Sequence, residues 1–335
     1  MSEASDGSRQ AAGANGQRAL KVAVLDDYQG VALELAAWDT LPKGSEVVVF
    51  SDHLSDEAAL VERLAPFEAI VAMRERTPFP RRLLERLPAL RLLVTTGRRN
   101  AAIDVPAAKE RGVLVCGTDG LPYPTAELTW GLILALARRI PEEDRALRSG
   151  SWQTTLGVGL SGKTLGVLGL GRLGEQVARI GRAFDMRVIA WSQNLTSERA
   201  RQASAEWVSR ETLFREADVL SVHLVLSERT RGLVGGSELG LMKPSAYLIN
   251  TSRGPIVDEV ALIAALERKT LAGAGLDVFD REPLPAGHPL LRLENTVLTP
   301  HLGYVTRETY DIFYQQALED IVGFLRGTPL RELGA

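Results

Sequence analysis

Short runs of apolar residues alternate along this chain with segments in which apolar residues recur every three or four positions. The first five runs are KVAVLD (21–26), EVVVF (46–50), EAIVAM (68–73), LRLLVTT (90–96) and GVLVC (112–116). Runs of this length, separated by amphipathic segments, are typical of parallel strands that are covered by helices. They predict an α/β fold that begins near residue 20, with Ser55 as the N-cap of a helix that ends at Leu64.

A second series of apolar runs follows a long helical segment. Residues 124–148 carry apolar side chains at helical spacing, and the Gly- and Ser-rich residues 149–162 are typical of a linker. The six later runs cover residues 164–170, 187–191, 218–224, 246–251, 272–279 and 295–300. Six strands with helices between them match a complete dinucleotide-binding sheet, and residues 306–326 predict a final helix.

The composition is that of a folded protein of two domains. The chain has 335 residues, about twice the usual domain length of roughly 150, and 45% of them are hydrophobic. The net charge of −3 gives no electrostatic reason to bind nucleic acid or an anionic membrane. The single cysteine, Cys116, excludes an internal disulfide, and its apolar surroundings predict a buried thiol. The four histidines are dispersed, so we expect no metal site.

The sequence contains no signal for export or for membrane insertion. The longest apolar stretch, residues 129–137, is nine residues long, whereas a span needs about 20. Residues 1–19 are small and polar, lack the apolar core of a secretory signal, and predict a disordered tail. We therefore expect a cytoplasmic protein.

Residues 169–174 read Gly-Leu-Gly-Arg-Leu-Gly, directly after a predicted strand and at the start of a predicted helix. This is the context that a phosphate-binding loop requires. Gly169 permits the tight turn, Gly171 lets the backbone approach a pyrophosphate, and Gly174 lets the helix pack against the strand. Arg172 and Leu173 complete the loop, whose backbone N–H groups would meet the pyrophosphate. We therefore predict NAD or NADP as the cofactor.

The position that recognises the adenine ribose carries no acid. An NAD site usually places Asp or Glu near the end of the second strand, about 20 residues after the loop. Here that strand ends in Trp191, followed by Ser192, Gln193 and Asn194. Because no carboxylate stands there to repel a 2′-phosphate, we expect NADP to be tolerated.

Longer segments resemble the D-isomer-specific 2-hydroxyacid dehydrogenase family, which includes glyoxylate/hydroxypyruvate reductases and 3-phosphoglycerate dehydrogenases. The segments that carry this resemblance are LSGKTLGVLGLGRLG (160–174), MKPSAYLINTSRGPIVDEVALIAAL (242–266), AGAGLDVFDREPLP (272–285) and NTVLTPHLG (295–303). The resemblance implies hydride transfer between NAD(P)(H) and a D-2-hydroxy acid/2-keto acid pair.

The resemblance also implies a domain organisation. It predicts two doubly wound parallel-sheet domains with a cleft between them. The NAD(P)-binding Rossmann domain would cover 121–300. It would be inserted into a flavodoxin-like substrate domain made of 20–120 and 301–335. A homodimer built through the nucleotide-binding domain is implied as well, with the helical segment 124–148 in its interface.

By resemblance, the catalytic residues are Arg253, Glu282 and His301. The chemistry of 2-keto acid reduction needs the same residue types. An imidazole ionises near working pH, so His301 is the natural proton donor to the carbonyl oxygen. Glu282 would orient His301 and favour its charged form. Arg253 would bind the substrate carboxylate and polarise the carbonyl with its planar donors.

Further cofactor contacts follow from the resemblance only. They are Asp277 for the nicotinamide carboxamide, Val225 and Thr230 beside the adenosine half, and Thr251, Ser252 and Gly303 at the nicotinamide end. For Asp277 the alternative is a cap of a strand end, and for Val225 it is ordinary core packing.

The segment that would bind the substrate carboxylate departs from the family pattern. The family often has Gly-x-Gly-x-Asp there, whereas this chain reads Gly97-Arg98-Arg99-Asn100-Ala101. Together with Arg74, the two arginines predict a cationic pocket for a second acidic group on the substrate. The alternative is that they are surface arginines.

Two other functions remain open at this point. Arg98 and Arg99 would suit the phosphate of a 3-phosphoglycerate dehydrogenase. A non-catalytic NAD(H)-sensing protein of the same fold is also compatible with the motifs, and only a turnover assay separates it. Formate dehydrogenases of this fold pair their histidine with Gln, whereas this chain has Glu282. The expected partners are a small 2-hydroxy or 2-keto acid and a second copy of the chain.

Overall fold

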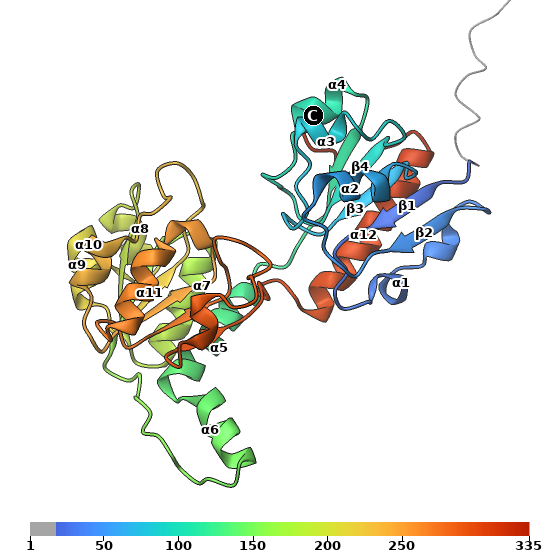
Figure 1. Cartoon of the computed structure of the whole chain (residues 1–335). Helices are drawn as coiled ribbons and strands as arrows, with labels where there is room; N and C mark the ends of the chain where they lie inside the picture. Colours follow the sequence, from blue (N-terminus) through green and yellow to red (C-terminus); the bar gives the residue numbers. More distant parts are fainter. Residues whose placement is uncertain (1–17, 335) are drawn as a thin grey trace, which may run out of the picture. The chain divides into compact units, whose positions relative to one another are not determined.

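The computed structural model describes residues 18–334. It divides the chain into two compact units (Figure 1). Unit 1 comprises Met1–Leu121 and Thr306–Ala335, and unit 2 comprises Pro122–Val305. The tail predicted for 1–19 lies almost wholly outside the described residues. Within those residues, no helix combines the length and the apolar character needed to cross a membrane.

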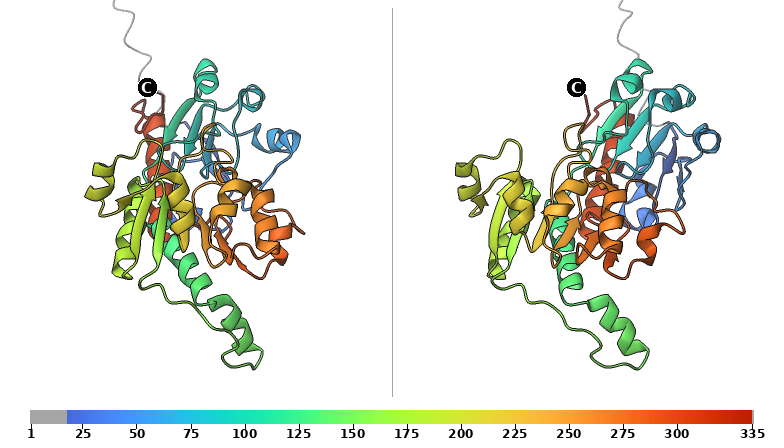
Figure 2. Two further views of the ribbon diagram at one scale, coloured as in Figure 1. Left: turned by 90° about the vertical axis from the view of Figure 1, so that its left-hand side faces the viewer. Right: turned by 60° about the vertical axis from the view of Figure 1, so that its left-hand side comes forward.

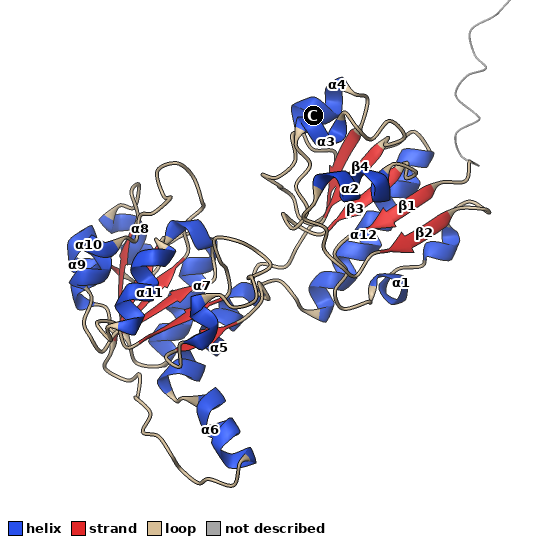
Figure 3. Ribbon diagram, in the orientation of Figure 1, coloured by secondary structure: helices blue, strands red, loops and turns tan. Residues whose placement is uncertain are grey.

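Unit 1 is built on a five-stranded parallel sheet in the order β2-β1-β3-β4-β5 (Figure 3). The strands are β1 (Lys21–Val24), β2 (Glu46–Val49), β3 (Ala69–Ala72), β4 (Leu92–Thr95) and β5 (Leu114–Gly117). The helices are α1 (Ala32–Leu35), α2 (Glu57–Leu64), α3 (Arg81–Leu84), α4 (Val105–Glu110) and α12 (Arg307–Leu325), with one 3₁₀ turn at Trp38–Thr40. Every residue of β3 and β4 is buried, as expected for strands covered on both faces. All five strands of this unit match apolar runs predicted from the sequence.

Unit 2 is built on a seven-stranded parallel sheet in the order β12-β11-β10-β9-β6-β7-β8. The strands are β6 (Thr164–Leu168), β7 (Arg187–Trp191), β8 (Glu206–Trp207), β9 (Val219–Val222), β10 (Tyr247–Asn250), β11 (Gly273–Leu276) and β12 (Thr296–Leu298). The helices are α5 (Pro124–Ala137), α6 (Ile140–Arg148), α7 (Arg172–Ala183), α8 (Ser197–Gln202), α9 (Arg210–Glu216), α10 (Gly236–Leu241) and α11 (Glu259–Glu267). Two 3₁₀ turns, Gly254–Ile256 and Pro289–Arg292, complete the unit. The strand order reverses at β6, so the glycine loop that follows β6 lies at the switch point where such sheets bind ligands.

The predicted helix over 124–148 is in fact two helices. Arg139 adopts a left-handed backbone conformation with a φ of 52°, which ends the run of helical residues after α5. Pro141 stands in the first turn of α6, a position that does not require a backbone N–H. Figure 2 shows α6 and the extended segment after it projecting away from the rest of unit 2.

Two smaller differences concern a helix start and a strand. Asp56 rather than Ser55 caps α2, because its carboxylate accepts a hydrogen bond from the Ala59 N–H at 2.8 Å. The strand β8, which the sequence did not predict, has only two residues and both are exposed. A run this short has no apolar pattern that could be recognised.

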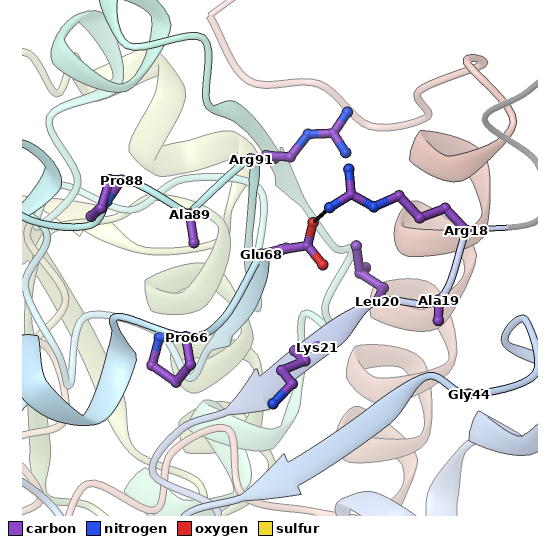
Figure 4. Close-up of a pocket in the computed structure, with 10 residues that line it drawn as sticks. All are labelled: Arg18, Ala19, Leu20, Lys21, Gly44, Pro66, Glu68, Pro88, Ala89 and Arg91. Carbon is purple, nitrogen blue, oxygen red and sulfur yellow. Dashed lines mark hydrogen bonds and ion pairs between the residues drawn. The ribbon is translucent and has the colours of Figure 1, made fainter.

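A surface pocket of about 560 Å³ lies beside the amino-terminal ends of the unit 1 strands (Figure 4). Its charged lining includes Glu68, Arg91 and Arg18, and Arg18 is paired with Glu68 at 2.6 Å. Ligands of open α/β sheets bind at the opposite, carboxyl edge. The active site is therefore expected at the carboxyl edges of the sheets rather than at this pocket.

Candidate active site

The glycine loop of unit 2 has the backbone that a dinucleotide site requires. Gly169 has a φ of 105°, and a Cβ at this position would lie 2.8 Å from the carbonyl group of His223. A Cβ on Gly174 would lie 2.2 Å from the Gly169 carbonyl oxygen, so α7 packs closely on the loop only because residue 174 is glycine. These two positions exclude every other residue type.

The start of α7 has open space for an anion, and its first backbone N–H groups are available to donate hydrogen bonds to it. Gly171 is the N-cap of this twelve-residue helix, and no side chain caps its first N–H groups. Open space lies beyond Gly171, where an added Cβ would have no neighbour within 4 Å. Arg172 is exposed and Leu173 is half-buried at the helix start. The loop therefore fits the pyrophosphate of a dinucleotide.

The end of β7 carries the ribose position. Ser192 is half-buried, whereas Gln193 and Asn194 are exposed. Arg199, on α8, forms an ion pair with Glu175 of α7. The positive charge of Arg199 is therefore already paired with the Glu175 carboxylate near the expected ribose position.

The turn after β9 contains two of the predicted adenosine contacts. The Thr230 hydroxyl donates to the Val225 carbonyl at 2.7 Å, and it accepts from the Ser227 N–H at 2.8 Å. Thr230 thereby fixes the turn. The Val225 side chain is 83% exposed, which excludes the alternative that it is ordinary core packing.

Thr251 and Ser252 follow β10 and are engaged within unit 2. The Thr251 hydroxyl lies 2.8 Å from the hydroxyl of Thr129 on α5, and the Ser252 hydroxyl donates to the Leu224 carbonyl. These contacts fix the segment that presents Arg253. One guanidinium nitrogen of Arg253 donates to the Ser252 carbonyl at 2.7 Å, and Arg253 leads into the 3₁₀ turn at Gly254–Ile256.

The structure brings Glu282 and His301 into direct contact. Oε2 of Glu282 lies 2.6 Å from Nδ1 of His301, and Oε1 accepts a hydrogen bond from the Phe279 N–H at 2.9 Å. Burial alone would raise the pKa of Glu282. The hydrogen bond and the positive charge that His301 can offer outweigh this effect, so the pKa of Glu282 is lowered, with a smaller contribution from Arg253.

The contact with Glu282 defines which ring nitrogen of His301 can act on a substrate. Nδ1 is taken by Glu282, and no described residue forms a hydrogen bond with Nε2. The imidazole and the Tyr304 ring lie in an edge-to-face arrangement, with 5.5 Å between the ring centres. His301 has a left-handed backbone with a φ of 54°, which L-residues rarely adopt.

Asp277 and Gly303 lie on either side of this histidine loop. The Asp277 carboxylate accepts hydrogen bonds from the Thr299 hydroxyl, the Leu302 N–H and the Gly303 N–H. The Gly303 carbonyl accepts from the Thr125 hydroxyl at 2.8 Å. Both residues are therefore engaged inside unit 2, and their contacts with the nicotinamide stay a prediction.

In unit 1, the predicted substrate residues follow β3 and β4. The Arg74 N–H donates to the Thr96 hydroxyl at 2.9 Å, and its guanidinium donates to the Thr96 carbonyl at 3.1 Å. This guanidinium lies directly over Gly97, where an added Cβ would be 1.7 Å from Nη1. Arg98 is paired with Asp119 at 2.5 Å, and Arg99 is exposed. The cationic pocket for a second acidic group on the substrate stays a prediction.

Sequence reasoning missed a second carboxylate–imidazole pair in unit 1. Nδ1 of His53 lies 2.9 Å from Oδ1 of the buried Asp26, whose other oxygen accepts from the Thr77 hydroxyl at 2.6 Å. The signal was available, because Asp26 follows β1 and His53 follows β2, and these strands are neighbours in the sheet. Among the described residues, no three His, Cys, Asp or Glu side chains gather as metal ligands.

Comparison with known proteins decides the family. Residues 130–303 match the model of the D-isomer specific 2-hydroxyacid dehydrogenase, NAD binding domain. The chain belongs to this family. The family resemblance and the α/β fold class predicted from the sequence are thereby confirmed.

Individual relatives cover most of the chain. A glyoxylate reductase from Aeropyrum pernix is 46% identical over 255 residues, which are 73% of this chain and 76% of that protein. A D-3-phosphoglycerate dehydrogenase from Archaeoglobus fulgidus is 37% identical over 291 residues, 86% of this chain but 55% of that protein. The crystal structure of a phosphoglycerate oxidoreductase from Vibrio cholerae is 41% identical, with a TM-score of 0.87 over 92% of this chain and 99% of that chain.

This 2-hydroxyacid dehydrogenase family member is an NAD(P)-dependent oxidoreductase that acts on a hydroxy acid/keto acid pair. The predicted cofactor and reaction type are confirmed at this level. The roles of individual site residues, the cofactor preference and the substrate remain predictions.

Proposed function

We propose that this chain reduces a small 2-keto acid to the D-2-hydroxy acid, with His301 as proton donor, Glu282 as its orienting partner and Arg253 as the carboxylate-binding residue. The observation that carries the proposal is the contact of 2.6 Å between Nδ1 of His301 and Oε2 of Glu282. A carboxylate on one ring nitrogen fixes the tautomer and the ring orientation, so the other nitrogen is the one that exchanges a proton with substrate.

Each residue would have one task in the reduction. The loop 169–174 would hold the pyrophosphate of the reduced cofactor, whose nicotinamide would supply the hydride to the carbonyl carbon. Nε2 of His301 gives its proton to the carbonyl oxygen, so that the carbonyl, the hydride and this proton together form the CH–OH group. Glu282 stabilises the charged imidazole before the transfer. Arg253 binds the substrate carboxylate through its planar donors, and its charge polarises the adjacent carbonyl.

Glyoxylate is the substrate class that the comparisons favour. Glyoxylate reductases from Aeropyrum pernix and Thermococcus litoralis are 46% and 39% identical to this chain, and the matches include 76% and 83% of those proteins. The test is a panel of glyoxylate, hydroxypyruvate, pyruvate, phenylpyruvate and 3-phosphoglycerate, each with NADPH or NADH, or with the oxidised cofactor for 3-phosphoglycerate. The proposal expects the highest kcat/KM for a two- or three-carbon keto acid, and no turnover with any of them would contradict it.

The second candidate is 3-phosphoglycerate oxidation. The exposed Arg99 and the relatives named D-3-phosphoglycerate dehydrogenase support it. Against it, Arg98 is already paired with Asp119, which leaves fewer cations for a phosphate. In the same panel, turnover of 3-phosphoglycerate above that of the keto acids would establish this alternative.

We further propose that the chain forms a homodimer through unit 2. Trp152 and Leu156, in the extended segment after α6, are 76% and 93% exposed. Ile140 and Leu147 of α6 are exposed as well, and large apolar groups that project from one segment are typical of an interface. Sedimentation velocity should show a dimer that dissociates in a Trp152→Ser, Leu156→Ser double variant. A monomeric wild type at micromolar concentration would contradict the proposal.

A further inference from the structure

The sheet of unit 1 has a switch point of its own, between β1 and β3. In the order β2-β1-β3-β4-β5, the chain leaves β1 for a strand on one side of it and returns to a strand on the other side. The two strands β1 and β3 are paired neighbours (Figure 1). Ligands of open α/β sheets bind at the carboxyl ends of the strands at such a point. In unit 1 these ends lead into residues 25–29 and residues 73–77.

Both of these loops contain a residue in the left-handed backbone region at the same place. Asp26 is the second residue after β1 and has a φ of 57°, and Arg74 is the second residue after β3 and has a φ of 51°. Residues with a Cβ rarely adopt this conformation, and it persists only where surrounding contacts hold it. The direction of the Arg74 side chain therefore depends on whatever fixes residues 74–77.

Asp26 connects the loops that follow β1, β2 and β3. Its Oδ2 accepts a hydrogen bond from the Thr77 hydroxyl at 2.6 Å, and its backbone carbonyl accepts one from Nη1 of Arg76 at 2.7 Å. Its Oδ1 lies 2.9 Å from Nδ1 of His53 in the loop after β2. The Asp26 side chain is 1% exposed, so these contacts are made away from water.

The loop after β3 is held at its other end by residues that follow β4. The Arg74 carbonyl accepts a hydrogen bond from the Asn100 side chain at 2.6 Å, and the Arg74 N–H donates to the Thr96 hydroxyl at 2.9 Å. Asp26 thus supplies the contacts from the β1 side and Asn100 those from the β4 side. Loss of either set would leave the left-handed turn at Arg74 supported on one side only.

We propose that Asp26 is the positioning residue for Arg74. Its carboxylate, held between His53 and Thr77, fixes the loop after β3 so that the Arg74 guanidinium is presented to the acidic group of the substrate. This inference rests on the proposed function, because it takes the substrate to be a 2-keto acid. The Asp26–His53 pair has no proton to exchange with the substrate, in contrast to Glu282 and His301.

The chemistry of its partners explains why residue 26 is a carboxylate. The Thr77 hydroxyl donates, and opposite an ionised carboxylate Nδ1 of His53 carries the proton and donates as well. A carboxylate only accepts, so it can serve both partners with one oxygen each. Arg76 brings a positive charge to the same residue, and a buried charge needs such a partner. An Ala at position 26 would leave two polar side chains without their acceptor.

The partners of Asp26 allow the positioning role to be tested without changing this buried residue. Thr77→Val keeps the shape of the side chain and removes the donor to Oδ2, and Thr77→Ser restores a hydroxyl. His53→Phe removes the donor to Oδ1, and His53→Asn restores a donor near the place of Nδ1. Asp52→Asn is the matched control, because Asp52 precedes His53 but pairs with Arg63 at 2.7 Å rather than with Asp26.

The experiment measures kcat and KM for glyoxylate and the Kd of NADPH by fluorescence titration, all on the full-length protein. We expect Thr77→Val and His53→Phe to raise KM roughly tenfold, since small displacements of a binding group have effects of this size. Their kcat should change less than threefold, because loss of substrate binding raises KM without lowering kcat. The Kd of NADPH should change less than twofold, and Thr77→Ser, His53→Asn and Asp52→Asn should resemble the wild type.

A double variant tests whether the effect passes through Arg74. Arg74→Met removes the guanidinium and keeps most of the side-chain length, so it should raise KM by itself. A residue that acts only by positioning Arg74 has nothing left to position in this background. We therefore expect Thr77→Val to raise KM less than twofold further when it is added to Arg74→Met.

Three results would overturn the inference. The first is a KM for Thr77→Val and His53→Phe equal to that of Asp52→Asn. The second is a full tenfold effect of Thr77→Val in the Arg74→Met background. The third is a Kd of NADPH that rises in step with KM, which would indicate a general loss of structure. Failure of the proposed function would look different, because turnover would then survive in a His301→Ala variant.

Discussion

Glu282 and His301 are joined by a hydrogen bond of 2.6 Å between Oε2 and Nδ1, and the other carboxylate oxygen is held by the Phe279 N–H. Glu282 is thus fixed at both oxygens, and it fixes the imidazole in turn. Replacing the carboxylate with an amide of the same shape removes the charge and keeps the size.

Glu282→Gln should therefore narrow the pH range of keto-acid reduction. The reduction needs a protonated imidazole, and a neutral amide no longer favours that form. We expect the alkaline limb of the kcat profile to move to lower pH, with activity lost first above neutrality. The measurement is kcat at saturating keto acid and NADPH from pH 5.5 to 9. An unmoved profile would show that Glu282 only stabilises the loop.

The missing acid at residue 192 predicts that NADPH is accepted at a rate comparable to or above NADH. A 2′-phosphate would meet no fixed negative charge there, and the Ser192 hydroxyl can donate to it. Ser192→Asp should shift preference toward NADH through repulsion and regained ribose hydrogen bonds, by about 1–3 kcal/mol, the usual scale for hydrogen bonds to charged groups.

The test of the Ser192 prediction is kcat/KM for both cofactors in both proteins, with Ser197→Asp on α8 as a control of equal charge. Strong preference of the wild type for NADH would show that discrimination arises elsewhere, for example in the turn at Gln193 and Asn194.

Asp320, in the interior of α12, makes the stability of unit 1 depend on pH. Its side chain is 0% exposed, with Arg331 Nε at 3.2 Å from Oδ1, and burial raises its pKa to about 6 from 3.8. Between these two values the folded state binds more protons than the unfolded state. The contribution of Asp320 to the free energy of unfolding therefore falls as pH rises from about 4 to 6, by about 3 kcal/mol in total.

The measurement is urea unfolding of the wild type and of Asp320→Asn, each at pH 4.5 and at pH 7. At each pH it gives the difference between the free energies of unfolding of the two proteins, and the effect is the change in this difference with pH. The wild type should lose stability relative to Asp320→Asn as the pH rises. Asp311→Asn, on the same helix with a half-buried side chain, should show no such trend. A stability difference that is independent of pH would contradict the assignment.

Much of the architecture could be read from residue patterns alone. The strands β1–β5 and six of the seven strands of unit 2 coincide with apolar runs, because buried parallel strands need continuous apolar residues. The glycine loop was recognisable because a Cβ at residue 169 or 174 would clash with the neighbouring backbone, so only glycine fits at these two positions. The prediction that Arg253, Glu282 and His301 are the catalytic residues rests on the family motifs that contain them, because their spacing along the chain does not indicate a shared site.

Features that depend on tertiary contacts were not predictable. The end of α5 at Arg139 is not such a feature, because Pro141 is a local signal that interrupts a helical pattern. The contacts between Asp277 and residues 299–303 join adjacent strands that are more than 20 positions apart, and nothing local in either segment indicates them. The pairing of Arg98 with Asp119 likewise depends on the loops after β4 and β5 meeting at one sheet edge.

The central claim is that His301 donates the proton, and replacing this residue by Ala tests it most directly. Turnover of glyoxylate with NADPH at saturating concentrations should fall at least ~100-fold across pH 6–8, since general acid catalysis contributes at least that factor. The Kd of NADPH, measured by fluorescence titration of the same variant, should stay near the wild-type value, because the glycine loop is unchanged. Near-normal turnover in His301→Ala over this pH range would contradict the account.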